Sequence, residues 1–131
     1  MDYIALLLSS FMFGGMLLFS IGFGSLSFKF LDIVVARKFI RKTFPFFYGY
    51  VLCVSAVTAL FCLSVSTLTV MIATLIFLTT IPTSVVLMPA INKAADAKRK
   101  RSFFVLHTVS VSITLLHIIM SGLLLYLISN S

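Results

Sequence analysis

Acidic side chains are almost absent from the sequence: of 131 residues only three are Asp or Glu, namely Asp2, Asp32 and Asp96. All three lie outside the long apolar stretches, which excludes proton or sodium coupling through a carboxylate inside a membrane. An HExxH motif, a CxxC motif, a phosphate-binding glycine loop and paired carboxylates are also missing. From these absences we predict that the chain has no catalytic residues and no metal site, and they favour a protein that is not an enzyme.

Cysteine is scarce as well, with only Cys53 and Cys62 in the chain. A helix turns by about 100° per residue, so two residues nine positions apart point to opposite sides. The two thiols therefore cannot bridge each other or share a metal ion. We expect both to act as small packing residues.

Hydrophobic residues dominate instead: they make up 61% of the chain, and charged residues only 10%. Soluble domains average about 45–50% apolar and about 25% charged residues. Four apolar stretches each exceed the roughly 20 helical residues that cross a bilayer. Because neither a basic leader nor an A-x-A-like cleavage site accompanies the first stretch, we expect it to be retained. The pattern predicts an all-α, integral membrane, antiparallel four-helix bundle formed by residues 1–131 as a single domain, with spans at about 3–28, 44–64, 67–91 and 102–128.

All ten Lys and Arg residues fall in two short windows, 29–42 and 93–101, which separate the first span from the second and the third from the fourth. Basic loops collect on the cytoplasmic side of membranes, so we expect both windows there, or on the matrix side, and both termini opposite. This topology suits a bacterial inner membrane or an organellar membrane, and it explains the positive charge without nucleic acid. We expect contact with anionic lipid from Arg37, Lys38, Arg41, Lys42, Lys98, Arg99, Lys100 and Arg101.

The first basic loop has helical periodicity. Its apolar residues share one face (Leu31, Val34, Val35 and Phe39), and its basic residues share the opposite face. This is typical of a helix lying in the headgroup plane, with Pro45 then starting the second span. Pro82 should kink the third span, where neighbouring Thr and Ser hydroxyls can bond the freed carbonyl. Pro89 should mark the end of that span.

Small and polar residues recur at spacings of three and four, which lets membrane helices approach closely. The stripe of the fourth span comprises His107, Ser110, Thr114, His117 and Ser121. The first span offers Gly15, Leu18, Gly22, Ser25 and Lys29. The second offers Tyr48, Leu52, Ser55, Ala59, Cys62 and Ser66. We expect these stripes to face the bundle interior, either for packing alone or around a site.

The candidate polar site comprises Lys29, Tyr48, His107, Ser110, Thr114 and His117. His117 lies about 22 Å into the fourth span, where an ionisable group is costly and often functional. A neutral imidazole bonded to a neighbouring hydroxyl would also be stable there, so both interpretations stay open. His107, Lys29 and Tyr48 share a shallower depth and are expected to form a polar cluster at the cytoplasmic boundary.

The sequence does not identify a cofactor, but it leaves open haem or another flat cofactor held by one of the histidines. His107 and His117 are about 15 Å apart along one helix, so they cannot ligate the same iron or zinc ion. Either could supply one axial ligand to a haem.

Several short motifs resemble the transmembrane protein 205 family, a membrane domain of unknown function. They are Gly14-Gly15-Met16, Phe28-Lys29, Lys42-Thr43-Phe44-Pro45, Leu87-Met88-Pro89 and Phe103-Phe104-Val105-Leu106-His107. The resemblance implies a four-span bundle without an established reaction, whose shared residues are Lys29, Phe44, Pro45, Pro89 and His107. The chain departs from that pattern at Lys29, Thr83 and Thr114, where the family carries Arg, a more polar group and Asn.

Three functions remain. The first is an accessory or structural subunit that packs in a larger membrane complex, in a homo-oligomer or against lipid. The second is a bundle that binds a haem-type cofactor or handles a small solute through His107 or His117. The third is a small transporter that uses the helix break at Pro82.

Overall fold

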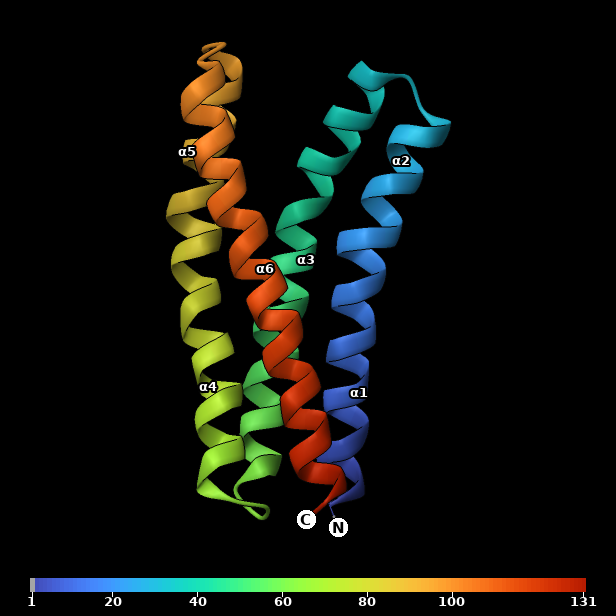
Figure 1. Cartoon of the computed structure of the whole chain (residues 1–131), viewed down its shortest axis with the longest axis vertical. Coiled ribbons are helices and arrows are strands. Elements are labelled where there is room, and N and C mark those ends of the chain that lie inside the picture. The colour runs from blue at the N-terminus through green and yellow to red at the C-terminus, as the bar shows by residue number, and fades with distance from the viewer. Residues whose placement is uncertain (1) are drawn as a thin grey trace.

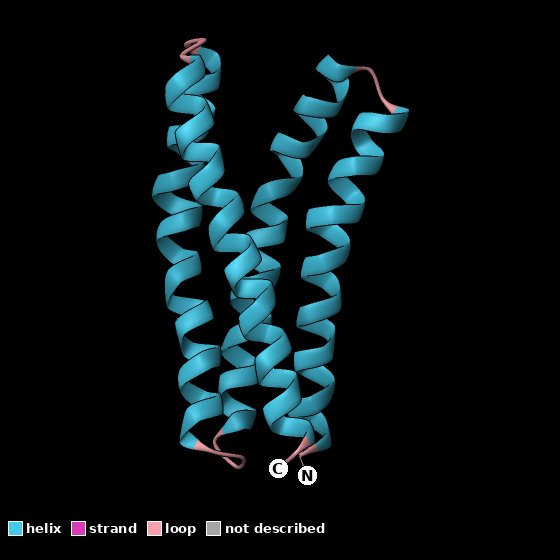
Figure 2. Ribbon diagram, in the orientation of Figure 1, coloured by secondary structure: helices cyan, strands magenta, loops and turns pink. Residues whose placement is uncertain are grey.

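Four long helical segments form an antiparallel bundle in the computed structural model, which describes residues 2–131 (Figure 1). No strand occurs in this part of the chain (Figure 2). All four segments are long and apolar enough to cross a membrane, which confirms the predicted all-α bundle. In chain order they are α1 (Tyr3–Leu17), the π-helix η1 (Leu18–Phe23) and α2 (Gly24–Phe30); α3 (Ile33–Cys62); α4 (Thr67–Pro82), the π-helix η2 (Thr83–Leu87) and α5 (Met88–Asp96); and α6 (Lys100–Ser129).

The helix ends have identifiable capping groups. The Asp2 carboxylate accepts hydrogen bonds from the backbone N–H groups of Ile4 and Ala5, both at 3.0 Å, and so caps α1. The Ser66 hydroxyl caps α4 in the same way. The turn from α5 to α6 places Lys98 at a positive φ of 55°, a conformation that usually selects glycine after a helix.

The bundle is closed at the end that carries the termini and spread at the other end (Figure 1). Near the termini α1 packs on α6 and α3, and α4 packs on the same two helices. Toward the basic turns the main contacts are α2 with α3 and α5 with α6. A bidentate ion pair between Arg41 of α3 and Asp96 of α5, with both N–O distances at 2.8 Å, links the two pairs.

The core is narrow, and most large apolar side chains lie outside it. Met12, Met16, Ile76 and Leu124 are almost completely buried. Leucine, phenylalanine, isoleucine and valine side chains are exposed along all four segments. Soluble monomers rarely expose so much contiguous apolar surface, whereas a bilayer covers it. The chain is therefore a multi-pass integral membrane protein.

The prediction of a separate interfacial helix in the first basic loop is wrong. α3 begins at Ile33 and continues without a break to Cys62, so Pro45 lies inside it and does not start it. Proline removes one hydrogen bond from a helix, and α3 tolerates that loss because it is helical on both sides of Pro45. At about 1.5 Å per residue, 30 residues give about 45 Å. This exceeds the hydrocarbon thickness of about 30 Å, so the N-terminal part of α3, which carries its basic residues, extends beyond the hydrocarbon.

The prediction that the stripe of the first span faces the bundle interior is also wrong over much of its length. Leu18 is 70% exposed, and Ser25 and Lys29 are exposed as well. The buried face of α1 is instead formed by Ala5, Ser9, Met12 and Met16. The π-helix η1 follows directly, and its wider turns rotate the later residues to a different face.

Pro82 is followed by a π-helix, so the backbone adjustment predicted there is present in a different form. The Thr83 hydroxyl donates to the carbonyl of Thr79 at 2.8 Å, one residue beyond the carbonyl that proline frees. Pro89 lies in the first turn of α5, and the helix continues to Asp96. The prediction that Pro89 ends this span is therefore wrong.

Candidate functional site

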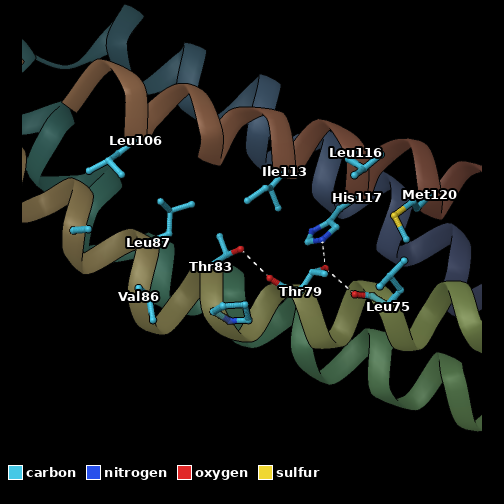
Figure 3. Close-up of a pocket in the computed structure, with 12 residues that line it drawn as sticks. Leu75, Thr79, Thr83, Val86, Leu87, Leu106, Ile113, Leu116, His117 and Met120 are labelled. Carbon is cyan, nitrogen blue, oxygen red and sulfur yellow. Dashed lines mark hydrogen bonds between the residues drawn. The ribbon is translucent and has the colours of Figure 1, made fainter. Parts of the chain in front are cut away.

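His117 is buried at the centre of α6, with 6% of its surface exposed, and it contacts α4 through one hydrogen bond. Its Nε2 lies 2.7 Å from the Thr79 hydroxyl (Figure 3). The same hydroxyl lies 2.7 Å from the Leu75 carbonyl oxygen, which can only accept. Because a hydroxyl carries one proton, Thr79 donates to Leu75 and accepts from the Nε2–H of His117. The network assigns this tautomer, and it leaves Nδ1 as an acceptor that has no partner within residues 2–131.

A pocket of about 510 Å³ opens beside His117 between α6 and the segment α4–η2–α5. Its walls are apolar except for Thr79, Thr83 and His117 (Figure 3). Leu75 and Leu116, which border it, are each about half exposed, at 50% and 55%. The pocket therefore opens sideways, toward the position of the lipid chains in a membrane, and not toward the bundle axis.

The sequence around Pro82 shapes one wall of this pocket. Pro82 cannot continue the α-helical hydrogen bonding, and the widened turns of η2 follow it directly. π-helical segments are often found at functional sites. The Thr83 side chain turns back onto the Thr79 carbonyl, so it holds the turn that presents Thr79 to His117.

A smaller depression of about 340 Å³ lies at the basic end of α6, lined by Arg101, Ser102, Val105 and Leu106. Leu106 also lines the larger pocket. The two depressions therefore adjoin on one face of α6.

A second buried polar contact joins α3 to α6. Tyr48 is 4% exposed, and its hydroxyl lies near the Ser110 side chain without reaching hydrogen-bonding geometry. Of the other predicted stripe residues on α6, Ser121 is fully buried and Thr114 is half-buried. The interior face of α6 therefore carries Ser110, His117 and Ser121.

His107 and Lys29 lie apart from this group. His107 is exposed and stacks on Phe103, with the ring centres 5.5 Å apart. The Lys29 ammonium lies 5.5 Å from the centre of the neighbouring Phe30 ring. No hydrogen bond or ion pair within residues 2–131 connects either residue to Tyr48. The structure thus divides the predicted polar site among different places.

The ten basic residues lie around the two turns at the spread end of the bundle. All eight residues predicted to contact anionic lipid are exposed, and Arg41 is engaged with Asp96. Hydrogen bonds from the Arg41 guanidinium lower the pKa of the Asp96 carboxyl, and the carboxylate raises the pKa of Arg41. At the opposite end, a hydrogen bond from Ser64 lowers the pKa of Asp2.

The described residues contain no group of three His, Cys, Asp or Glu side chains that could hold a metal ion. For a haem at His117, the Nε2 atom is the usual ligand, and here it is bonded to Thr79. Ligation through that atom would require this hydrogen bond to break.

Sequence reasoning missed the pairing of Thr79 with His117. It singled out the threonines near Pro82 only as partners for the backbone, because nothing in one sequence indicates which helix faces which. It also missed the contact of Tyr50 with Gly15, where the Tyr50 hydroxyl donates to the Phe11 carbonyl across the α1–α3 interface.

Comparison with known families gives one match. The model of a domain of unknown function (DUF4149) matches residues 7–100. Nearly all of α6, including His117, lies beyond the matched residues. No curated protein and no solved structure matches the chain.

Proposed function

The chain belongs to the family of domains of unknown function DUF4149, and from this premise we propose that it is a non-catalytic accessory or structural subunit in a membrane. It packs with its outer helix faces against a larger membrane complex or a second copy of itself, and against lipid elsewhere. We also propose that the chain is related to the transmembrane protein 205 family, which its short motifs resemble.

One observation carries this proposal: large apolar side chains are exposed on every helical segment, while the buried core consists mostly of small and medium residues, with Phe47 and Tyr48 as its large members. Leu7 and Phe11 on α1 and Ile119 on α6 are each more than half exposed. Membrane helices associate through packing complementarity without a hydrophobic drive from water. Such faces can accept either a lipid or a partner helix at little cost.

We further propose that the basic end faces the cytoplasm or the matrix and contacts anionic lipid. Each basic residue near such a surface contributes about 1 kcal/mol of attraction. Lys38 of α3 represents one cluster and Arg99, which precedes α6, represents the other; both side chains are exposed.

Native mass spectrometry tests this function on protein extracted from its own membrane in lipid discs. The proposal expects the chain in a complex of fixed stoichiometry, with other subunits or with itself. Recovery of the monomer alone in every preparation, at concentrations near those of the membrane, would contradict it.

A second candidate function, binding of an apolar ligand, is favoured by the unpartnered Nδ1 of His117 in an apolar pocket. If the ligand is haem, the purified protein should show a Soret absorption band that disappears in His117→Ala and persists in His107→Ala. A colourless preparation from haem-replete cells rules out haem at this site.

A further inference from the structure

The two depressions on α6 together offer both halves of an amphiphile-binding site. The deeper one is apolar over almost all of its lining, whereas the outer one has Arg101 and Ser102 at its rim. They meet at Leu106. A ligand that occupied both would place an apolar chain between helices and a polar head at the basic end.

The length of the groove fits one bilayer leaflet. From Leu106 to His117 the helix rises about 16 Å, at about 1.5 Å per residue. Half of the roughly 30 Å hydrocarbon core is about 15 Å. An acyl chain whose ester lies near Leu106 would therefore reach the neighbourhood of His117.

The charge at the rim selects a phosphate. Arg101 is exposed and forms no ion pair within the described residues, where Arg41 and Asp96 make the one salt bridge. A guanidinium binds phosphate oxygens with two parallel hydrogen bonds, and the Ser102 hydroxyl can donate a third. A carboxylate that would repel a phosphate is absent from the residues lining this rim.

A partner helix would lie across the mouth of the groove, because a helix about 10 Å in diameter occupies about 1,200 Å³ over the same 16 Å and the groove holds about 510 Å³. A single hydrocarbon chain is narrow enough to enter the groove.

We propose that this groove binds one phospholipid, with the phosphate on Arg101 and Ser102 and one acyl chain between η2–α5 and α6 as far as His117. The second acyl chain remains in the bilayer. This inference rests on the contact with anionic lipid proposed above and deepens it by assigning that contact one site. It does not depend on a partner protein, because the site is formed by one chain.

The test uses the full-length chain in mild detergent, titrated with phosphatidylglycerol and followed by native mass spectrometry. Arg101→Gln should weaken retention of the lipid about tenfold, the loss expected for a charge-assisted phosphate contact. Arg99→Gln removes the same charge two residues away, outside the lining of the groove, and should change retention less than about twofold. Equal losses in the two variants would reduce the effect to general attraction and overturn the proposal.

The groove itself is tested by filling it. Ala90 lines the groove and Ala95 is exposed on the same helix, α5. Ala90→Phe should abolish retention of phosphatidylglycerol, and Ala95→Phe should preserve it, with equal helicity by circular dichroism. Retention by Ala90→Phe would overturn the proposal, as would equal retention of diacylglycerol, which has the same chains without the phosphate.

A photo-crosslinking residue at Val86 distinguishes the occupants in native membranes. Val86 lines the groove and is 65% exposed. The proposal predicts a phospholipid adduct on the chain. A polypeptide adduct in its place would contradict the lipid site while supporting the subunit role, so the two proposals fail separately.

Discussion

Gly15 is the residue at which helix packing depends most on the absence of a side chain. A Cβ added there would overlap the Tyr50 ring and hydroxyl, and that hydroxyl is held by the Phe11 carbonyl. Gly15→Ala should therefore lower the free energy of unfolding by about 1–3 kcal/mol, as overpacking does elsewhere. Unfolding in bicelles measures this. Gly14→Ala, whose Cβ would meet nothing within 4 Å, is the matched control, and equal effects of the two substitutions would refute the argument.

The Thr79 hydroxyl links α4 to α6 through His117. Thr79→Val keeps the shape and removes the acceptor, so it should cost about 1 kcal/mol of unfolding free energy, within the range for hydrogen bonds between membrane helices. Nitrogen NMR of the imidazole should show the Nε2–H tautomer in the unsubstituted protein. Thr108→Val is the control, because that hydroxyl bonds only its own helix at Phe104. An Nδ1–H tautomer would contradict the assigned network.

The spacing of residues in the sequence predicted part of the buried face of α6. The stripe on the fourth span is buried at Ser110, His117 and Ser121, because spacings of three and four follow a regular helix. Its first member, His107, is exposed, since the helices have separated at that depth. The partner of His117 could not be predicted, because one sequence does not reveal which helices face each other.

Among the turns, the one between α5 and α6 carries conformational strain at Lys98. Left-handed geometry costs a non-glycine residue about 1–2 kcal/mol, and Lys98 has a φ of 55°. Lys98→Gly should therefore raise the unfolding free energy, by up to about 1 kcal/mol after the greater entropy of unfolded glycine is subtracted. Lys93→Gly removes the same charge inside α5 and should destabilise by about 1 kcal/mol. If Lys98→Gly destabilised as much as Lys93→Gly, the turn would not be strained.

The Arg41–Asp96 pair connects the two helix pairs at the spread end. Arg41 lowers the pKa of Asp96 in the folded state. The contribution of the ion pair to stability is therefore fully present above the unfolded-state pKa of about 3.9, and it is lost as pH falls through the lowered pKa. Spin labels at positions 38 and 93, in a background without native cysteines, should move apart on acidification through that range. Asp96→Asn should show the wider distance at neutral pH. Unchanged distances in both experiments would show that the pair does not hold the helices.

Hydropathy predicted the existence and order of the helices but not their details. Four apolar runs must cross as helices, because lipid cannot satisfy exposed backbone groups. The π-helix η2 follows Pro82, where the sequence predicts a helix break, whereas η1 follows no proline and no pattern in the sequence predicted it. Amphipathic periodicity in the first basic loop was visible, yet it could not show that α3 continues through Pro45 into the membrane.

At the scale of the whole molecule, the structure unites features that lie far apart in the sequence. Both basic turns lie at one end of the bundle, where the helices spread apart, and both termini lie at the other end (Figure 1). An even number of antiparallel segments requires this arrangement, so the sequence could predict it. The spread of the basic end follows from which residues pack there, and composition alone does not contain that information.

The four helical segments cross the membrane, and we propose that both basic turns lie on its cytoplasmic or matrix side. Single cysteines at positions 38, 99 and 130, in a chain whose Cys53 and Cys62 are replaced, can be labelled with a membrane-impermeant maleimide in sealed vesicles. The predicted result is that 38 and 99 react from the same face, the cytoplasmic or matrix one, and 130 from the opposite face. Labelling of 38 and 99 from opposite faces would contradict it.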